Sequence, residues 1–417
     1  MRVYLAKDPI YVLAAISTII IGADTIAITK GVRLTVLTMP LAFLLMARAR
    51  SWNIYVDRQY LISFLLFLII AILSISGSYN INNSILYCFW IAFSGIVVCL
   101  LFFNLALLYD RERIARLVMI TWRLHAGYVV PVAILKLALG MRHDLRVTMW
   151  FYEPSNFSIF LLPYYAVALH RVGKYGVRHW PDLALSLAGL IFLFSGTAII
   201  GILLLGAMVA FMLRVRLVWF ISFVAVLAAL TTVGTLLFQD TAIYGATVGW
   251  LLNSDAPLEA VTIRGGNRVK RFMMGYDAAK QHPWLGIGVG ADEKYSSEVG
   301  ASADLMAAQF LDFKSDTAGW GQPFLVTYSQ IAAECGYPGL IAFLAIVGYA
   351  LYVYRYRITH DPISDAYFVA FFATNIAIQM GDNYLRQYIW AFLGLALAQK
   401  CEQAPQGMHI TPNPASG

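Results

Sequence analysis

Arginines in three separated segments are the residues whose type and spacing point most directly to chemistry. A guanidinium group binds phosphate oxygens through two parallel hydrogen bonds, and several guanidinium groups together make a clamp for a pyrophosphate. The pattern therefore predicts an anionic lipid headgroup as ligand. The alternative is that these side chains contact phospholipid headgroups or nearby carboxylates. The six arginines are Arg142, Arg146, Arg264, Arg268, Arg271 and Arg386.

Two further side chains are candidates for proton transfer. Glu153 precedes Pro154 and Ser155, and a carboxylate at such a site can take a proton from a hydroxyl group within hydrogen-bond reach. The alternative is structural, with Pro154 in the first turn of a helix that begins there. His282 is a second candidate base or a structural hydrogen-bonding residue. The glycines that follow His282, at 286, 288 and 290, favour a tight backbone turn over a phosphate-binding role.

The amino-acid composition predicts that membrane-spanning helices position these residues. Of the 417 residues, 60% are hydrophobic and only 13% are charged, about half the charged share of an ordinary soluble protein. About 20 apolar residues cross a bilayer as a helix. We therefore predict an all-α polytopic membrane protein with about 12 transmembrane helices. The predicted spans are 10–28, 33–48, 60–77, 84–109, 114–139, 156–170, 182–195, 196–213, 217–238, 323–354, 364–381 and 385–400.

The distribution of basic residues predicts the orientation. With the N-terminus inside, short inner connections hold thirteen Lys and Arg residues and short outer connections hold five. The net charge of +7 is thus a topology signal, and no nucleic-acid partner is expected. This N-in, C-in arrangement divides the chain into nine N-terminal spans (1–238), a large folded periplasmic loop (239–322), three C-terminal spans (323–400) and a disordered cytoplasmic tail (401–417). Helical periodicity from Arg268 to Lys280 supports a folded loop.

Some polar residues fall inside predicted spans. Asp24, Arg123 and His125 are interpreted as buried helix–helix ion pairs or hydrogen bonds, and Lys136 as a side chain that reaches the membrane surface. The four cysteines lack metal-ligand spacing, so neither a zinc site nor a disulfide is expected.

Two segments resemble a known family. The stretch Arg146-Val-Thr-Met-Trp-Phe-Tyr-Glu153-Pro154-Ser155 resembles the Arg-x-x-Gly-x-Phe-x-Glu-Pro-Ser signature of bacterial O-antigen and exopolysaccharide polymerases of the Wzy type. The second segment begins at Asn267-Arg268 and continues through His282-Pro-Trp-Leu-Gly286-Ile-Gly288-Val-Gly290 to Gln330-Ile-Ala-Ala-Glu334-Cys-Gly336. It is similar to the arginine-rich loop helix, the His-Pro-x-x-Gly-x-Gly turn and the Ala-Glu-x-Gly helix break of the O-antigen ligase and polymerase superfamily.

The resemblance implies a GT-C-like glycosyltransferase of the bacterial inner membrane. Such an enzyme joins polyprenyl-pyrophosphate-linked oligosaccharide units at the periplasmic face, with Arg146, Arg268 and Arg386 stabilising the pyrophosphate leaving group and Glu153 as the base. Arg142, Arg271 and His282 are further substrate-binding candidates. No metal or other cofactor is expected; membrane lipid and a regulator of chain length are expected partners.

Departures from the family pattern leave alternatives open. O-antigen ligases carry a His-Asn pair nine residues before the glutamate, where this chain has Leu325 and Val326. That difference favours the polymerase branch over ligase-like transfer of a lipid-linked glycan to another acceptor. Met149 replaces the signature glycine, and Gly196 stands where an arginine is common. A transporter of lipid-linked sugars would show repeated halves, which the chain lacks, and a non-catalytic scaffold is a third alternative.

Overall fold

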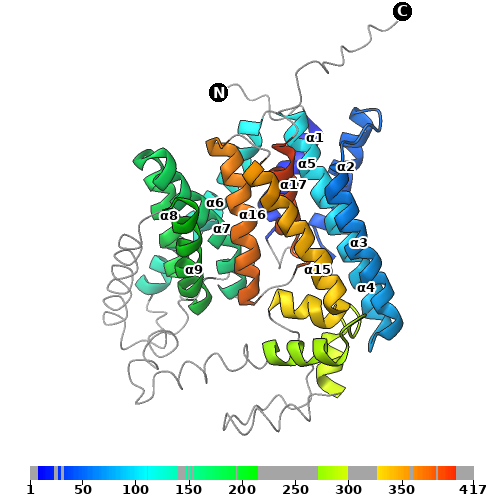
Figure 1. Ribbon diagram of the computed structural model, residues 1–417. Coiled ribbons are helices and arrows are strands. Elements are labelled where there is room, and N and C mark those ends of the chain that lie inside the picture. Colours follow the sequence, from blue (N-terminus) through cyan, green and yellow to red (C-terminus); the bar gives the residue numbers. More distant parts are fainter. Residues whose placement is uncertain are drawn as a thin grey trace, which may run out of the picture.

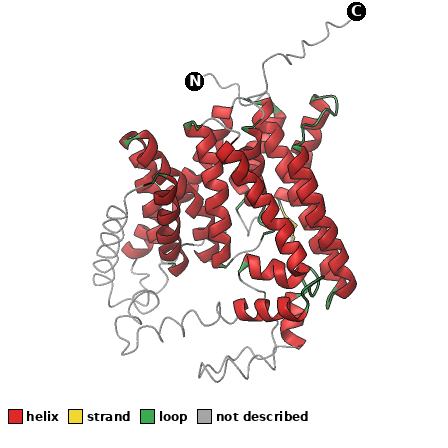
Figure 2. Cartoon of the chain, in the orientation of Figure 1, coloured by secondary structure: helices red, strands yellow, loops and turns green. Residues whose placement is uncertain are grey.

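The computed structural model is helical over nearly all of the chain that it describes (Figure 2). The strands within those residues are a short antiparallel pair, β1 (Ala27–Thr29) and β2 (Val32–Arg33). The predicted span 10–28 is therefore too long, because its last residues, which include β-branched Ile28, lie in a strand. The structure describes residues 8–22, 27–29, 32–109, 111–139, 147, 151, 154–193, 195–214, 271–298, 326–356, 360–381 and 384–400.

Twelve long helices have bounds that the structure defines. They are α1 (Pro9–Ile20), α2 (Thr35–Ala49), α3 (Arg58–Ser74), α4 (Ile81–Ala92), α5 (Cys99–Leu108), α6 (Arg111–Ala138), α7 (Pro154–Tyr175), α8 (Trp180–Phe192), α9 (Gly196–Met212), α15 (Thr327–Tyr356), α16 (Pro362–Ala377) and α17 (Gln387–Ala398). Short 3-10 turns follow at Ile75–Gly77, Val177–His179 and Ile378–Met380, and a π-helical segment, Phe93–Val98, joins α4 to α5. Residues 271–281 and 292–298 are also helical.

These helices agree with most of the predicted spans. Every predicted span other than 217–238, which lies outside the described residues, overlaps a described helix. Ser195 separates α8 from α9, so this region forms two helices. By length and composition, five helical segments of the described chain suffice to cross a membrane: Arg58–Gly77, Ile81–Leu108, Arg111–Lys136, Thr327–Tyr356 and Pro362–Met380. The prediction of a helical membrane protein is confirmed, and the number of transmembrane helices, twelve, stays a prediction.

Aspartates fix the starts of several helices. Asp8 accepts hydrogen bonds from the backbone N–H groups of Ile10 and Tyr11 and so caps α1. Asp57 caps α3 in the same way, and Asp361 caps α16. A carboxylate at this position satisfies N–H groups that have no partner within the helix. Pro9 and Pro362, in the first turn of their helices, have no N–H group to satisfy.

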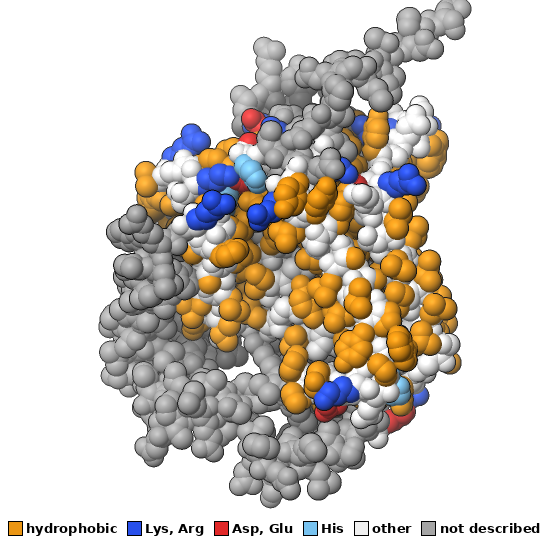
Figure 3. All heavy atoms as spheres, in the orientation of Figure 1, with side chains coloured by type: hydrophobic (Ala, Val, Ile, Leu, Met, Phe, Trp, Pro, Cys, Tyr) orange, Lys and Arg blue, Asp and Glu red, His pale blue; other side chains and the backbone are white. Residues whose placement is uncertain are grey.

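The core of the bundle is built around α17. All of its residues are buried, and it packs against α5 and α16, while α7 packs on α16 and α3 packs on α15 (Figure 1). The face of α3 that points away from this core exposes Ile62, Leu66 and Ile69. Figure 3 shows a band dominated by hydrophobic side chains across the middle of the visible face, with Lys and Arg gathered toward its ends. Such a band is the surface that a bilayer covers.

Hydrogen bonds and ion pairs link the connections that were predicted to share the inner side. Arg50, after α2, donates to Asn104 near the end of α5. Lys400, after α17, contacts the α3 cap Asp57 at 3.1 Å. Arg111, which begins α6, pairs with Asp361 at 3.2 Å. The start or end of each of these helices therefore lies at one end of the bundle, as an alternating path through a membrane requires.

Candidate active site

The opposite end of the bundle holds the described members of the predicted site. Arg271, His282 and Arg386 are among the described residues. Arg142, Arg146, Glu153 and Arg268 lie outside them, so the meeting of Arg146, Arg268 and Arg386 stays a prediction. In Figure 1 the segment 271–298 lies at the end of the bundle where α3 and α4 meet, below α15.

A break in α15 creates the framework of this end. Gly336 has φ 69° and ψ 179°, a conformation that is essentially restricted to glycine, and Pro338 follows without an N–H group. The first turns of α15 therefore run at an angle to the rest of the helix (Figure 1). The helix break expected from the Ala-Glu-x-Gly motif is confirmed.

The turn after His282 pairs with the broken helix. The N–H groups of Ile287 and Gly288 donate to the carbonyl oxygens of Ala333 (2.8 Å) and Glu334 (3.1 Å). In the other direction, the N–H group of Tyr337 donates to the carbonyl oxygen of Pro283 at 2.8 Å. Backbone groups that the break removes from the helix are thus satisfied by the turn, as an apolar surrounding requires.

The glycines of the turn are structural. Gly286, Gly288 and Gly290 all have positive φ, between 66° and 93°. A Cβ atom at Gly286 would overlap the backbone carbonyl group of Glu334 and would lie 2.5 Å from the carbonyl oxygen of Ala333. These observations agree with the interpretation of the three glycines as residues that permit a tight turn.

The same turn is attached to the connection between α3 and α4. The N–H group of Tyr79 donates to the carbonyl oxygen of Ile287 at 3.1 Å, and the side-chain amide of Asn83 donates to the carbonyl oxygen of Gly290. The N–H group of Val289 lies 3.4 Å from the hydroxyl oxygen of Ser74. The turn consequently bridges α15 and the α3–α4 connection.

A buried polar cluster lies where these segments meet. Glu334 is fully buried, and its two carboxyl oxygens accept hydrogen bonds from the side-chain amide of Gln330 (2.9 Å) and the hydroxyl of Tyr384 (2.6 Å). The amide nitrogen of Gln330 also lies 3.5 Å from a carboxyl oxygen of Asp292. Four residues of this cluster were not predicted as site residues: Glu334, Gln330, Tyr384 and Asp292. The signals for Glu334 were its place in the Ala-Glu-x-Gly motif and its acidic side chain in an otherwise apolar helix.

Two of the predicted arginines flank this cluster along the chain. Arg386 follows Tyr384 by two residues and is the N-cap residue of α17, with no side-chain capping hydrogen bond. The N-terminal N–H groups of a helix carry partial positive charge and attract anions. Arg271 is the first described residue of the helical segment 271–281, which leads into the His282 turn. The structure therefore connects two of the three predicted site segments to the same glutamate.

His282 packs among aromatic rings. Its ring contacts those of Tyr79 and Tyr295 edge to face, at centroid distances of 5.9 and 6.1 Å. The Tyr295 hydroxyl donates to Gln281 at 3.2 Å, and burial raises the pKa of Tyr295. These contacts support the structural interpretation of His282; its use as a base is untested.

A family match extends across much of this framework. The model of a family described as O-antigen ligase matches residues 183–344. This match supports membership of the O-antigen ligase and polymerase superfamily. The matched residues include the helix 271–281, the His282 turn and the α15 break with Glu334, and they exclude Arg146, Glu153 and Arg386. No curated protein matches the chain. Membership supports glycan transfer by an integral membrane protein of bacterial type, with lipid-linked oligosaccharide as substrate.

Two of the polar residues predicted to lie within spans, Arg123 and His125, have partners in neighbouring helices. Arg123 of α6 donates to both carboxyl oxygens of Asp182 in α8, at 2.7 and 2.9 Å, and Tyr164 of α7 donates to the same carboxylate. His125 lies 2.9 Å from the carbonyl oxygen of Ile19. The interpretation of Arg123 and His125 as helix–helix contacts is confirmed. His125 is buried as predicted, whereas the Arg123 side chain is 52% exposed, so its ion pair is not a buried one. Asp24 lies outside the described residues.

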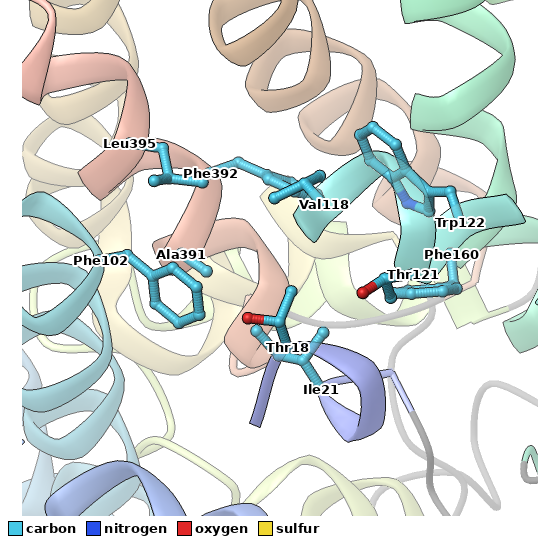
Figure 4. A pocket seen from close by; sticks show the side chains of 10 residues that line it. All are labelled: Thr18, Ile21, Phe102, Val118, Thr121, Trp122, Phe160, Ala391, Phe392 and Leu395. Carbon is cyan, nitrogen blue, oxygen red and sulfur yellow. The ribbon is translucent and has the colours of Figure 1, made fainter. Parts of the chain in front are cut away.

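A small apolar cavity lies elsewhere in the bundle, between α1, α5, α6, α7 and α17 (Figure 4). Its hydroxyl groups, on Thr18 and Thr121, donate to carbonyl oxygens within their own helices. The hydroxyl protons are therefore already used, and the rest of the lining is apolar apart from the indole of Trp122, so the cavity does not resemble a site for a sugar or a phosphate. Its lining comprises Thr18, Ile21, Phe102, Val118, Thr121, Trp122, Phe160, Ala391, Phe392 and Leu395.

Proposed function

We propose that the protein is a polysaccharide polymerase of the inner membrane, with its N- and C-termini in the cytoplasm and the Glu334 end of the bundle at the periplasmic face. It joins polyprenyl-pyrophosphate-linked oligosaccharide repeat units without a metal ion. The observation that carries the proposal is the Tyr384–Glu334 hydrogen bond, because it ties the Arg386 segment to the turn that follows the Arg271 helix. Both segments were singled out in the sequence for pyrophosphate binding.

The electrostatics of this end favour a pyrophosphate leaving group. As the bond between the sugar carbon and the pyrophosphate oxygen breaks, its electron pair moves onto the pyrophosphate, and preorganised positive groups lower the barrier. In the proposal, Arg386 and the N-terminal N–H groups of α17 supply such groups, and the N-cap position of Arg386 supports this assignment. Arg146, Arg268 and Arg271 are the further cations in the proposal, and Arg142 and His282 contact the rest of the substrate.

The bond that forms joins the same sugar carbon to a hydroxyl oxygen of the acceptor repeat. Glu153 accepts the hydroxyl proton and later releases it to water, while the polyprenyl pyrophosphate leaves with the negative charge. The product remains on the lipid of the acceptor unit and can react again. Repetition of one transfer therefore gives a ladder of lengths, and a separate chain-length regulator is a partner that this reaction would use.

Ligase-like transfer is the second candidate because the matching family is described as O-antigen ligase. Purified protein incubated with lipid-linked repeat units separates the candidates on a gel. A ladder supports the polymerase, a single transferred unit supports ligase-like chemistry, and no product contradicts both. Arg178→Ala, which changes an exposed arginine in the connection before α8, is the matched control for Arg386→Ala. The proposal requires the ladder to survive the first substitution and not the second.

A further inference from the structure

Tyr384 is held at three points. Its hydroxyl donates to Glu334 at 2.6 Å, and its backbone carbonyl oxygen accepts a hydrogen bond from the indole N–H group of Trp390 at 2.8 Å. Its ring packs edge to face on Phe67 and Phe343, at centroid distances of 6.0 and 6.2 Å. The side chain is fully buried, so this residue has one well-defined position.

Glu334 is also held by several contacts, and the burial of its carboxyl group has a desolvation cost. A buried carboxyl group contributes little net stability, since a well-packed apolar residue often serves as well. The side-chain amide of Gln330 donates to one carboxyl oxygen of Glu334, and the backbone carbonyl oxygen of Glu334 accepts the N–H group of Gly288. Its hydrogen bond to Tyr384 joins residues 50 positions apart in the chain. A buried ionisable group with such partners indicates a functional role.

The chain between Tyr384 and α17 is short. Arg386 comes two residues after Tyr384, and its carbonyl oxygen accepts the N–H group of Ile389 at 3.1 Å, in the first turn of α17. The backbone of Arg386 is thus fixed by Tyr384 on one side and by α17 on the other. Small shifts of a charged group that contacts a reacting centre reduce rates strongly, and about 1 Å can cost about 100-fold.

We infer that Tyr384 is a positioning residue, which Glu334 holds in place so that the Arg386 guanidinium meets the pyrophosphate. This inference rests on the proposed function, because it takes Arg386 as a pyrophosphate-binding group. It assigns the buried Glu334–Tyr384 pair a role in substrate binding rather than in folding alone. Tyr384 acts only through Arg386, and this dependence makes the role testable.

A double-mutant cycle tests the dependence. Purified protein in lipid nanodiscs is titrated with polyprenyl pyrophosphate, and the Kd is measured for wild type, Tyr384→Phe, Arg386→Ala and the double variant. We expect Tyr384→Phe to weaken binding about tenfold, the loss typical of one hydrogen bond to a charged group. In the Arg386→Ala background the same change should weaken binding less than about twofold. Equal effects in both backgrounds would overturn the inference.

Two further variants separate positioning from general destabilisation. Tyr165→Phe removes another fully buried tyrosine hydroxyl, one without a hydrogen-bond partner, and should leave the Kd unchanged. Glu334→Leu removes both acceptor oxygens at a similar side-chain volume, and it should reproduce the Tyr384→Phe effect. Wild-type binding by either Glu334→Leu or Tyr384→Phe would also overturn the inference.

The binding readout keeps the two proposals distinct. If wild-type protein makes no ladder while the cycle shows the expected dependence, the polymerase proposal fails and the positioning role stands. If a ladder forms while the two substitutions act independently, the positioning role fails alone. If Arg386→Ala binds polyprenyl pyrophosphate as tightly as wild type, Arg386 is not a pyrophosphate-binding residue and the inference falls with it.

Discussion

Gly336→Ala is the sharpest test of the framework around Glu334. With φ 69° and ψ 179°, Gly336 adopts a conformation that costs another residue about 1–3 kcal/mol. A Cβ atom there would lie 2.5 Å from the carbonyl oxygen of Trp284 and 2.7 Å from that of Pro283, whereas Cβ atoms essentially never approach within 3.0 Å. Overpacking of this kind costs a further 1–3 kcal/mol or so. The two contributions together predict a loss of about 2–6 kcal/mol.

The assay is reversible unfolding of the purified protein in mixed micelles, followed by circular dichroism. Gly348→Ala is the matched control, because Gly348 lies in the same helix and a Cβ atom there meets nothing within 4 Å. Alanine should stabilise that position by up to about 1 kcal/mol. The two substitutions therefore change the free energy of unfolding in opposite directions. Equal unfolding free energies for the two variants would refute the account of the helix break.

Four other outcomes are expected. Asp182→Asn should lower the free energy of unfolding by about 1.5–3 kcal/mol, because Arg123 and Tyr164 both donate to that carboxylate; an unchanged unfolding curve would contradict this. Arg146→Ala and Arg268→Ala should each abolish long glycan on a gel while the protein remains in the membrane fraction, and normal polymer from both would remove the arginine clamp. Glu153→Gln should reduce kcat more than the affinity for lipid-linked substrate, and a wild-type rate would make it a helix-capping residue. Addition of a chelator should leave the ladder intact if arginines alone stabilise the leaving group, so its loss would argue for a metal.

Hydropathy was a sufficient guide to the helices because lipid leaves the backbone few choices. The backbone of a segment in hydrocarbon must form its hydrogen bonds within that segment. Long apolar runs such as 60–77 and 84–109 therefore form helices whatever their neighbours in the fold. The type of helix within an apolar run depends on contacts with other helices. The π-helical segment Phe93–Val98 has no hydropathy signal; there the hydroxyl of Tyr60 donates to the carbonyl oxygen of Gly95 at 2.7 Å. Hydropathy thus identifies a helix without describing its interior.

The candidate site was harder to predict, since its contacts join residues far apart in the chain. Arginines and the His282 turn were visible as local patterns, and the α15 break followed from a short motif. Glu334 and Tyr384 are 50 residues apart, and Asn83 and Gly290 are 207 apart. A single sequence carries no signal for such pairs, because tyrosines and amides are common and their partners depend on how helices pack. The sequence therefore indicated the type of ligand but not the framework that positions its binding groups.

The two ends of the bundle use their buried carboxylates differently. At the predicted cytoplasmic end, Asp57 contacts Lys400 and Asp365 contacts Lys174, so cations complete the structural contacts. At the other end, the partners described above for Glu334 are an amide and a hydroxyl group. A pyrophosphate ligand competes with a carboxylate for the cation of a structural ion pair. It competes far less for hydroxyl and amide donors that already form hydrogen bonds within a buried cluster. A framework of neutral donors can therefore stay intact while an anionic substrate binds and leaves, which is what repeated transfer requires.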